Sequence, residues 1–236
     1  MKESKTIPTR RFFRLKSTFD YAKSKRKDGK EMFIVAKTQS RGRGRNERSF
    51  SSKKGGLYFT WLHYPQNLSS KSAFLLIRQA AVAVCKTIEC YGVQPTIKWP
   101  NDVLVGGKKV SGILTENTLR GDLISSSVVG IGINIHNLLE EDLRPIATTL
   151  QEVIGKKIPV RDVEEKLKKN LLLPVAAEEY YARLSHLGKV EIIEGENRYS
   201  AYAEGVDEEG LLVVLVDGVR HKKSAAEISL RQKEKQ

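Results

Sequence analysis

The pattern of hydrophobic residues changes at Gly188, and this change constrains the fold more than any other feature. Before it, short apolar runs alternate with long amphipathic stretches, of which residues 73–90 give the clearest helix pattern. After it come only short apolar runs separated by turns rich in Gly and Asp. Strands with turn residues every ~8–12 positions are typical of a small barrel or sandwich. We therefore predict an α/β domain over residues 1–187 and a small β domain over 188–236.

The larger domain is expected to combine helices with buried strands. Ser17 and Thr18 are suited to cap a first helix, and residues 160–187 are predicted to be helical with a bend or break at Pro174. Residues 38–54 lack apolar periodicity and are predicted to be a loop. Strands are predicted at 10–15, 32–37, 57–62, 95–99, 103–105, 110–114 and 127–135, with a hairpin at the Gly106-Gly107 pair.

The positive charge of the chain is concentrated at one end. Residues 1–60 carry 18 Lys and Arg against 5 Asp and Glu, which equals the net charge of +13 of the whole chain. Such a field attracts anions: nucleotide phosphates, nucleic acid or an acidic protein. A solvated basic surface without a specific partner is the plain alternative, especially for residues 23–30.

Several classes of protein are disfavoured. Cys85 and Cys90 lie in an apolar, helix-like stretch and are expected to be reduced and buried, not a disulfide scaffold. The start of the chain has no signal-peptide pattern, and no apolar run approaches the ~20 residues of a membrane span. We therefore expect a cytoplasmic protein. The four histidines lack zinc-ligand spacing, and no catalytic triad is suggested.

An arginine- and glycine-rich loop at residues 39–48 is the first segment that could carry chemistry. Its glycines allow close approach of the backbone to a ligand, and its alternating arginines supply bidentate donors for phosphate or carboxylate. Because like charges repel, the loop should be mobile when empty and ordered by an anion. Taken alone, it could equally be a linker that binds RNA weakly.

A second segment begins with Lys98-Trp99-Pro100-Asn101-Asp102. A strand ending in a rigid proline turn can aim the Asn and Asp side chains into a cleft. Lys109 follows in a hairpin that returns beside this turn, where an amine could neutralise a carboxylate and then a developing phosphate charge. Gly112 would let a ligand lie against the strand.

A third segment, Gly130-Ile131-Gly132-Ile133-Asn134, only superficially suggests a dinucleotide fingerprint. The third glycine of that motif is missing, because Ile135 follows, and no helix pattern comes next. Glycines in a buried strand mark the close approach of another segment or, alternatively, of a ligand with Asn134 at its edge.

Together, these segments resemble the biotin protein ligases, in the same order and at similar intervals. The family's Lys-Trp-Pro-Asn-Asp signature is present at residues 98–102, its Gly-Arg-Gly-Arg-x-Gly-Arg loop is matched by 42–48, its Lys-hydrophobic-small-Gly-Ile-Leu-x-Glu strand by 109–116, and its Gly-Ile-Gly-hydrophobic-Asn strand by 130–134. The resemblance covers nearly the whole chain. It implies an α+β fold, with a mixed central sheet and flanking helices like the class II synthetases, followed by a small SH3-like β-barrel.

Three positions depart from the family pattern. Phe19 stands where the family usually has Asn after Ser-Thr, Glu47 where the loop usually has Gly, and Phe50 where Trp is usual. Only residues 1–9 precede the first expected strand, so the chain resembles the monofunctional members without an N-terminal DNA-binding domain. The family often forms homodimers, which we also expect here.

The resemblance implies an ATP-dependent reaction in two steps. Biotin is activated to biotinyl-5′-AMP, with release of diphosphate, and is then transferred to a lysine of a biotin carboxyl carrier protein. Lys109, Arg43 and Arg45 are the implied catalytic residues, and Asp102 is the implied partner of Mg²⁺. The implied biotin-binding residues are Ser17, Thr18, Phe19, Gln39, Gly42, Arg43, Gly44, Arg45, Lys109 and Gly112. The implied ATP- and adenylate-binding residues are Arg43, Arg45, Arg48, Trp99, Asn101, Asp102, Lys109, Gly132 and Asn134.

Two other functions are considered. A lipoate ligase shares the adenylation chemistry and a related fold, but its family lacks the Lys-Trp-Pro-Asn-Asp signature. A nucleic-acid-binding module could use the basic first 60 residues, but it leaves that signature unexplained and would require binding that weakens steeply with salt.

Overall fold

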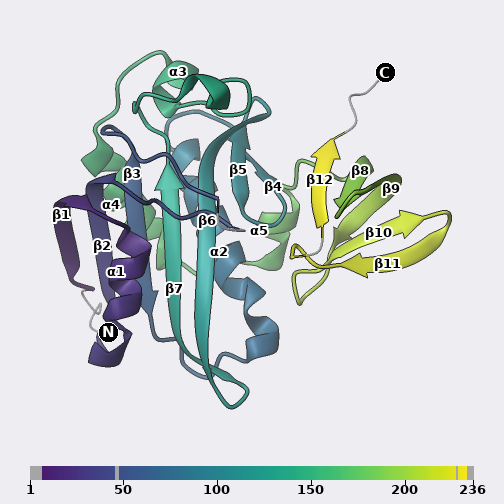
Figure 1. Ribbon diagram of the computed structural model, residues 1–236, viewed down its shortest axis with the longest axis horizontal. Coiled ribbons are helices and arrows are strands. Elements are labelled where there is room, and N and C mark those ends of the chain that lie inside the picture. The colour runs from purple at the N-terminus through teal and green to yellow at the C-terminus, as the bar shows by residue number, and fades with distance from the viewer. Residues whose placement is uncertain (1–6, 46–47, 227, 233–236) are drawn as a thin grey trace.

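The computed structural model describes residues 7–45, 48–226 and 228–232, and it contains two β-sheets (Figure 1). The larger sheet has seven strands in the order β1-β2-β3-β7-β6-β5-β4, and the smaller has five in the order β11-β10-β9-β8-β12. The larger sheet is mixed: β1 runs parallel to β2, and all other neighbouring strands of the sheet are antiparallel to each other. The predicted α+β class is confirmed.

The strands of the larger sheet follow the predicted apolar runs closely. Its inner strand β3 is buried along nearly its whole length, in keeping with a sequence in which only Thr60 and His63 interrupt the apolar residues. The seven strands are β1 (Thr9–Leu15), β2 (Met32–Gln39), β3 (Leu57–His63), β4 (Thr96–Lys98), β5 (Asp102–Val105), β6 (Lys108–Arg120) and β7 (Leu123–Ile133).

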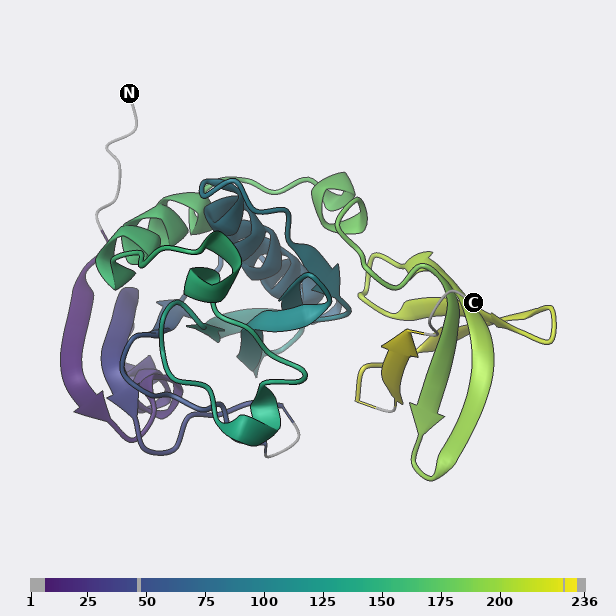
Figure 2. The ribbon, with the colours of Figure 1, turned by 90° about the horizontal axis from the view of Figure 1, so that it is seen from above.

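Helices cover both faces of this sheet (Figure 2). Alternate residues of β2 show the division, since side chains along a strand point to opposite faces. Phe33 belongs to the large core beneath α2 (Phe74–Glu89) and α4 (Val160–Leu171). Ile34 belongs instead to a smaller core beneath α1 (Thr18–Ser24). α1 begins where the sequence predicts, and Ser17 accepts a hydrogen bond from the Asp20 backbone amide at 3.2 Å.

The helices and strands differ from the predicted ones in three places. β6 continues to Arg120 and forms a long hairpin with β7, although its second half is polar. The predicted break at Pro174 is confirmed, because the chain leaves α4 before this residue and resumes as the short helix α5 (Ala177–Tyr181), but α5 ends before residue 187. A further short helix, α3 (Leu150–Ile154), was not predicted.

The C-terminal segment forms the five-stranded antiparallel sheet, which lies beside the larger one (Figure 2). The larger domain is hydrogen-bonded to this sheet by the Trp99 indole, which donates to the Gly210 carbonyl at 3.0 Å, and by Arg45, which donates to the Ala225 carbonyl. The strands are β8 (Gly188–Glu194), β9 (Asn197–Val206), β10 (Leu212–Val216), β11 (Val219–Lys223) and β12 (Ile228–Gln232). The expected β-rich character of the C-terminal residues is confirmed.

The two cysteines differ in environment. Cys85 is buried within α2, as expected, and burial raises the pKa of its thiol to about 12. Cys90 is exposed, which corrects the expectation for this residue, because it caps the C-terminus of α2 where the helix leaves the core. Among the described residues, no helix is long and apolar enough to cross a membrane.

Candidate active site

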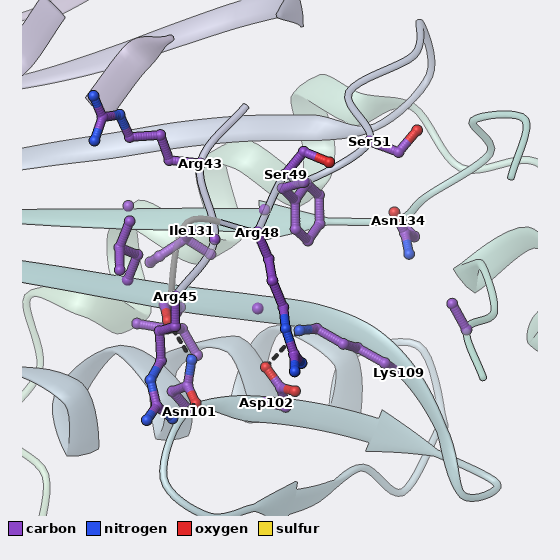
Figure 3. A pocket seen from close by; sticks show the side chains of 18 of the residues that line it. Arg43, Arg45, Arg48, Ser49, Ser51, Asn101, Asp102, Lys109, Ile131 and Asn134 are labelled. Carbon is purple, nitrogen blue, oxygen red and sulfur yellow. Dashed lines mark hydrogen bonds and ion pairs between the residues drawn. The ribbon is translucent and has the colours of Figure 1, made fainter. Parts of the chain in front are cut away.

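A cavity of about 720 Å³ opens at the end of the larger sheet that faces the C-terminal sheet. It lies over β7, β6 and β5 and is bordered by the N-terminus of α1, the arginine-rich loop and the turn at residues 98–102 (Figure 3). Of the residues predicted for the site, all except Gly42 line it: Ser17, Thr18, Phe19, Gln39, Arg43, Gly44, Arg45, Arg48, Trp99, Asn101, Asp102, Lys109, Gly112, Gly132 and Asn134.

One end of the cavity carries a network of uncharged polar groups. Gln39 Oε1 accepts hydrogen bonds from the Thr18 backbone amide at 2.7 Å and from the Thr18 hydroxyl at 2.9 Å. Thr60 donates to the Thr18 hydroxyl at 2.9 Å, and the Gln39 amide donates to Ser52 at 2.9 Å. Mutual bonds of this kind hold the side chains in one arrangement, so this end is preorganised for a neutral polar ligand.

Two glycines of β7 support aromatic rings on the floor of the cavity. A Cβ atom on Gly130 would lie 2.8 Å from the Phe19 ring, and one on Gly132 would lie 2.6 Å from the Phe50 ring. The glycines thus permit close approach of other segments of the chain, as considered from the sequence. Phe19 is only 5% exposed and packs with Ala22, so its aromatic ring fills a core position as well as lining the cavity.

The arginines of the loop have different partners. Arg43 Nε lies 2.8 Å from Asp20 Oδ1 at the N-terminus of α1. Arg45 donates to Asn101 Oδ1 at 3.0 Å as well as to the C-terminal sheet. Arg48 extends into the cavity toward Asp102 (Figure 3).

Gly42 lies behind the cavity and not in its lining. It is buried against the returning arm of the loop, where a Cβ atom would lie 2.3 Å from the Phe50 carbonyl oxygen. The glycine at this position therefore allows the loop to fold on itself. Glu47 lies outside the described residues.

The turn that follows β4 is held from several sides. The Trp99 backbone amide donates to His186 Nδ1 at 3.3 Å, and Tyr180 donates to the Pro100 carbonyl at 2.9 Å. Asn101 donates to the Ile113 carbonyl at 2.6 Å, which orients its side-chain oxygen toward Arg45. Burial, with a smaller effect of the charge of Lys98, lowers the pKa of His186 to about 4, so this imidazole is neutral near pH 7.

Lys109 lies at the centre of the cavity. Its amine is 2.6 Å from Asp102 Oδ1, and its side chain passes over Gly112, where a Cβ atom would come within 3.1 Å of the amine. The hairpin predicted from the Gly-Gly pair thus brings the amine to the turn, as the sequence indicated (Figure 3).

The opposite wall combines one amide with apolar side chains. Asn134 is 6% exposed, and its side-chain oxygen accepts from Asn137 at 3.2 Å. The segment after it contributes the apolar side chains Leu139, Leu143, Ile146 and Ala147.

The C-terminal sheet supplies a part of the lining that the sequence did not reveal. Ile193 and Arg198 pair across β8 and β9 and both face the cavity, together with Ala225 and Ile228. No sequence signal identifies them, because their role depends on how the two sheets pack.

The charges in the lining define the chemistry. Asp102 is the only carboxylate among the described lining residues, against the cations of Arg43, Arg45, Arg48, Lys98, Lys109 and Arg198. Such a site binds and neutralises an anionic ligand of several charges, while the polar end and the apolar wall accommodate uncharged groups.

This mixed sheet, with a cation-lined cavity over its inner strands, has the ligase fold seen in biotin protein ligases. It matches the structure of the biotin protein ligase from Aquifex aeolicus in complex with biotin and ATP, with 27% sequence identity, a TM-score of 0.76 and coverage of 96% of this chain and 99% of that chain. The chain belongs to the biotin/lipoate A/B protein ligase family, whose model matches residues 12–134.

Curated relatives match to different extents. The bifunctional ligase/repressor BirA of Bacillus subtilis is 42% identical over 130 residues, which cover 53% of this chain and 40% of that protein. The match therefore spans less than half of that relative's length. The biotin–[acetyl-CoA-carboxylase] ligase of Paracoccus denitrificans is 30% identical over 83% of this chain and 89% of that protein.

Proposed function

We propose that the chain is an ATP-dependent biotin protein ligase. In the first step, a biotin carboxylate oxygen attacks the α-phosphorus of ATP, forming biotinyl-5′-AMP and releasing diphosphate. In the second, the amine of a lysine of a biotin carboxyl carrier protein attacks the acyl carbon, forming an amide and releasing AMP. The names of the Paracoccus and Aquifex relatives support this activity.

The observation that carries the proposal is the order of groups across the sheet. The Thr18–Gln39 network lies toward β2, the glycines of β7 come next, and Lys109 on β6 faces Asp102 on β5. A ligand with a neutral urea-like head, an alkyl chain and a terminal carboxylate fits this order. Its ring would bond to Ser17, Thr18 and Gln39, and its carboxylate would reach the amine.

The residues around the reacting atoms act by position and charge. The Lys109 amine would neutralise the carboxylate and then the charge that develops on the α-phosphate oxygens, which favours the transition state over the bound substrates. Arg43, Arg45 and Arg48 would bind phosphate. Asn134 and the apolar wall suit the uncharged adenosine.

Mg²⁺ is part of the proposal. This ion is commonly held by one or two carboxylates together with substrate phosphates and water, so the single carboxylate of Asp102 fits that role beside ATP. The ion would neutralise phosphate charge. Asp102 would then exchange its pairing with Lys109 for one with the metal.

Loop closure would protect the mixed anhydride from water. Arg45 already links the loop to Asn101 and to the C-terminal sheet, so the elements needed for closure are in contact. We also propose, as expected from the sequence, a catalytic domain over 1–187 and a β domain over 188–236, a homodimer, and a cytoplasmic location.

Biotin-dependent exchange of labelled pyrophosphate into ATP tests the first step without a carrier. We expect exchange that requires biotin and that a tenfold excess of lipoate leaves nearly unchanged. Exchange supported by lipoate and not by biotin would favour a lipoate ligase. No exchange with either acid would contradict an adenylating activity.

A further inference from the structure

The segment between β7 and α4 contacts the backbone of Lys109 directly. The Lys109 amide donates to the Ile146 carbonyl at 2.9 Å, and the Thr148 amide donates to the Lys109 carbonyl at 3.0 Å. The pairing of β5 with β6 shifts register at this point, from Val103–Ser111 to Leu104–Lys109. Such a bulge re-aims side chains and weakens the ladder. The two bonds to the segment therefore fix where the Lys109 side chain points.

The same segment is also bonded to the strand end that carries Asn134. The amides of Leu150 and Gln151, at the start of α3, donate to the carbonyls of Asn134 at 3.0 Å and Ile135 at 2.8 Å. Six consecutive residues, 146–151, thus connect Lys109 on β6 with Asn134, directly after β7. The segment thus adds a second connection between the two proposed ligand contacts, beside the bond from the Asn134 amide to the carbonyl of Val110, the residue after Lys109, at 2.8 Å.

A capping box at the start of α3 holds that conformation. Glu152 Oε2 accepts from the Thr149 amide at 2.9 Å and from the Thr148 hydroxyl at 3.0 Å, and the Thr149 hydroxyl accepts from the Glu152 amide at 3.1 Å. Both threonines are buried, whereas the Glu152 side chain lies on the surface and outside the cavity lining. The carboxylate of Glu152 therefore fixes both Thr148, whose amide bonds to Lys109, and Thr149, which follows it.

The Glu152 carboxyl group is ionised when it accepts these hydrogen bonds. Partial burial raises the pKa of this carboxyl group, but the hydrogen bonds from Thr149 and Thr148 outweigh it, so the pKa lies below its usual value. The group is ionised near neutral pH and acts only as an acceptor.

We propose that Glu152 is a positioning residue for the ligase reaction, which holds Lys109 and Asn134 in their working arrangement through Thr148 and Thr149 without touching a substrate. The inference rests on the proposed function for its effect on the reaction. Its structural content, the tie between Glu152 and the Lys109 backbone, does not depend on that function.

The first test compares pyrophosphate exchange in three variants. Glu152→Ala should lower kcat about tenfold or more, because small misplacements of reacting groups cost rates of this order. Glu152→Gln should recover most of this loss, since its amide oxygen can still accept. Glu179→Ala is the matched control: Glu179 likewise accepts from the backbone amide that precedes its helix, that of Ala176 at 3.2 Å, and among the described residues no hydrogen bond joins α5 to Lys109. It should leave kcat within about twofold.

The second test does not need activity. Hydrogen exchange at the amides of Lys109 and Thr148 should accelerate about tenfold in Glu152→Ala and stay unchanged in Glu179→Ala. Unchanged protection at both amides in Glu152→Ala would overturn the proposal, as would equal kcat losses in the two alanine variants. The wild-type protein could also show no pyrophosphate exchange while Glu152→Ala accelerates hydrogen exchange at these amides. That combination would contradict the proposed function and support the structural tie.

Discussion

The amine of Lys109 on β6 lies 2.6 Å from the carboxylate of Asp102, at the start of the neighbouring strand β5. Both side chains are partly exposed to the cavity, so this pair adds little to folding stability. Its value is positional: it keeps the amine extended over Gly112, at the place where we propose that carboxylate and α-phosphate meet.

Replacement of Lys109 therefore tests the centre of the site. Lys109→Ala should lower biotin-dependent pyrophosphate exchange at least about 10²-fold, because it removes a preorganised charge at the reacting atoms. The circular dichroism spectrum and thermal unfolding should stay as in wild type. Lys108→Ala is the matched control, because Lys108 precedes it in β6 but is exposed and outside the lining. Exchange retained in Lys109→Ala would contradict the assigned role.

Arg45 is expected to retain the intermediate. Its bonds to Asn101 and to the Ala225 carbonyl connect the loop with both sheets, and glycine at this position would remove them. In Arg45→Gly, biotinyl-5′-AMP should dissociate about tenfold faster or more, measured by release of labelled intermediate on gel filtration. Arg41→Ala should retain it, since Arg41 is exposed and outside the lining. Equal retention in both variants would count against loop closure by Arg45.

Arg198 should act only in the first step. It reaches the cavity from the C-terminal sheet and, among the described residues, has no ion-pair partner, so it is available to ATP phosphates. Arg198→Gln should raise the KM for ATP about tenfold, because one hydrogen bond to a charged group is lost. The transfer of biotin from preformed biotinyl-5′-AMP should stay unchanged. Lys189→Gln, on β8 but outside the cavity lining, is the control. Impaired transfer with a normal KM for ATP would instead indicate a contact with the carrier.

His186 should make stability depend on pH. Burial lowers its pKa from 6.5 to about 4, so the unfolded chain binds a proton more readily than the folded one. The contribution of His186 to the free energy of unfolding is fully present above pH 6.5. It is lost as the pH falls toward 4, and the loss amounts to about 3 kcal/mol. In His186→Asn, whose side-chain oxygen can accept from the Trp99 amide, unfolding by urea should depend less on pH over this range. An unchanged pH dependence would mean that other groups produce it.

The sequence predicted most of the larger sheet, because its strands are short apolar runs bounded by turn residues. It missed the second half of β6, where residues 115–120 are largely polar and either partly buried or exposed, so that pairing with β7 and not burial defines the strand. It also missed α3, although Thr149-Leu150-Gln151-Glu152 has the spacing of a capping box. That signal was available.

The site was predictable wherever one short segment carried its own chemistry. The turn at 98–102 and Lys109 come together as expected, because a hairpin connects them. The lining from Ile193 and Arg198 was not predictable, since it depends on the packing of one sheet against another. Gly42 illustrates the opposite case, a residue in a ligand-binding motif whose position is required by the folding of the loop itself.

Transfer of labelled biotin tests the central claim most directly. The full chain is incubated with ATP, Mg²⁺, labelled biotin and a biotin carboxyl carrier domain, with a second carrier in which the acceptor lysine is replaced by arginine. We predict label on the first carrier only, dependent on ATP and lost with Lys109→Ala. An enzyme that catalyses pyrophosphate exchange but leaves both carriers unlabelled, or labels them equally, would contradict the account.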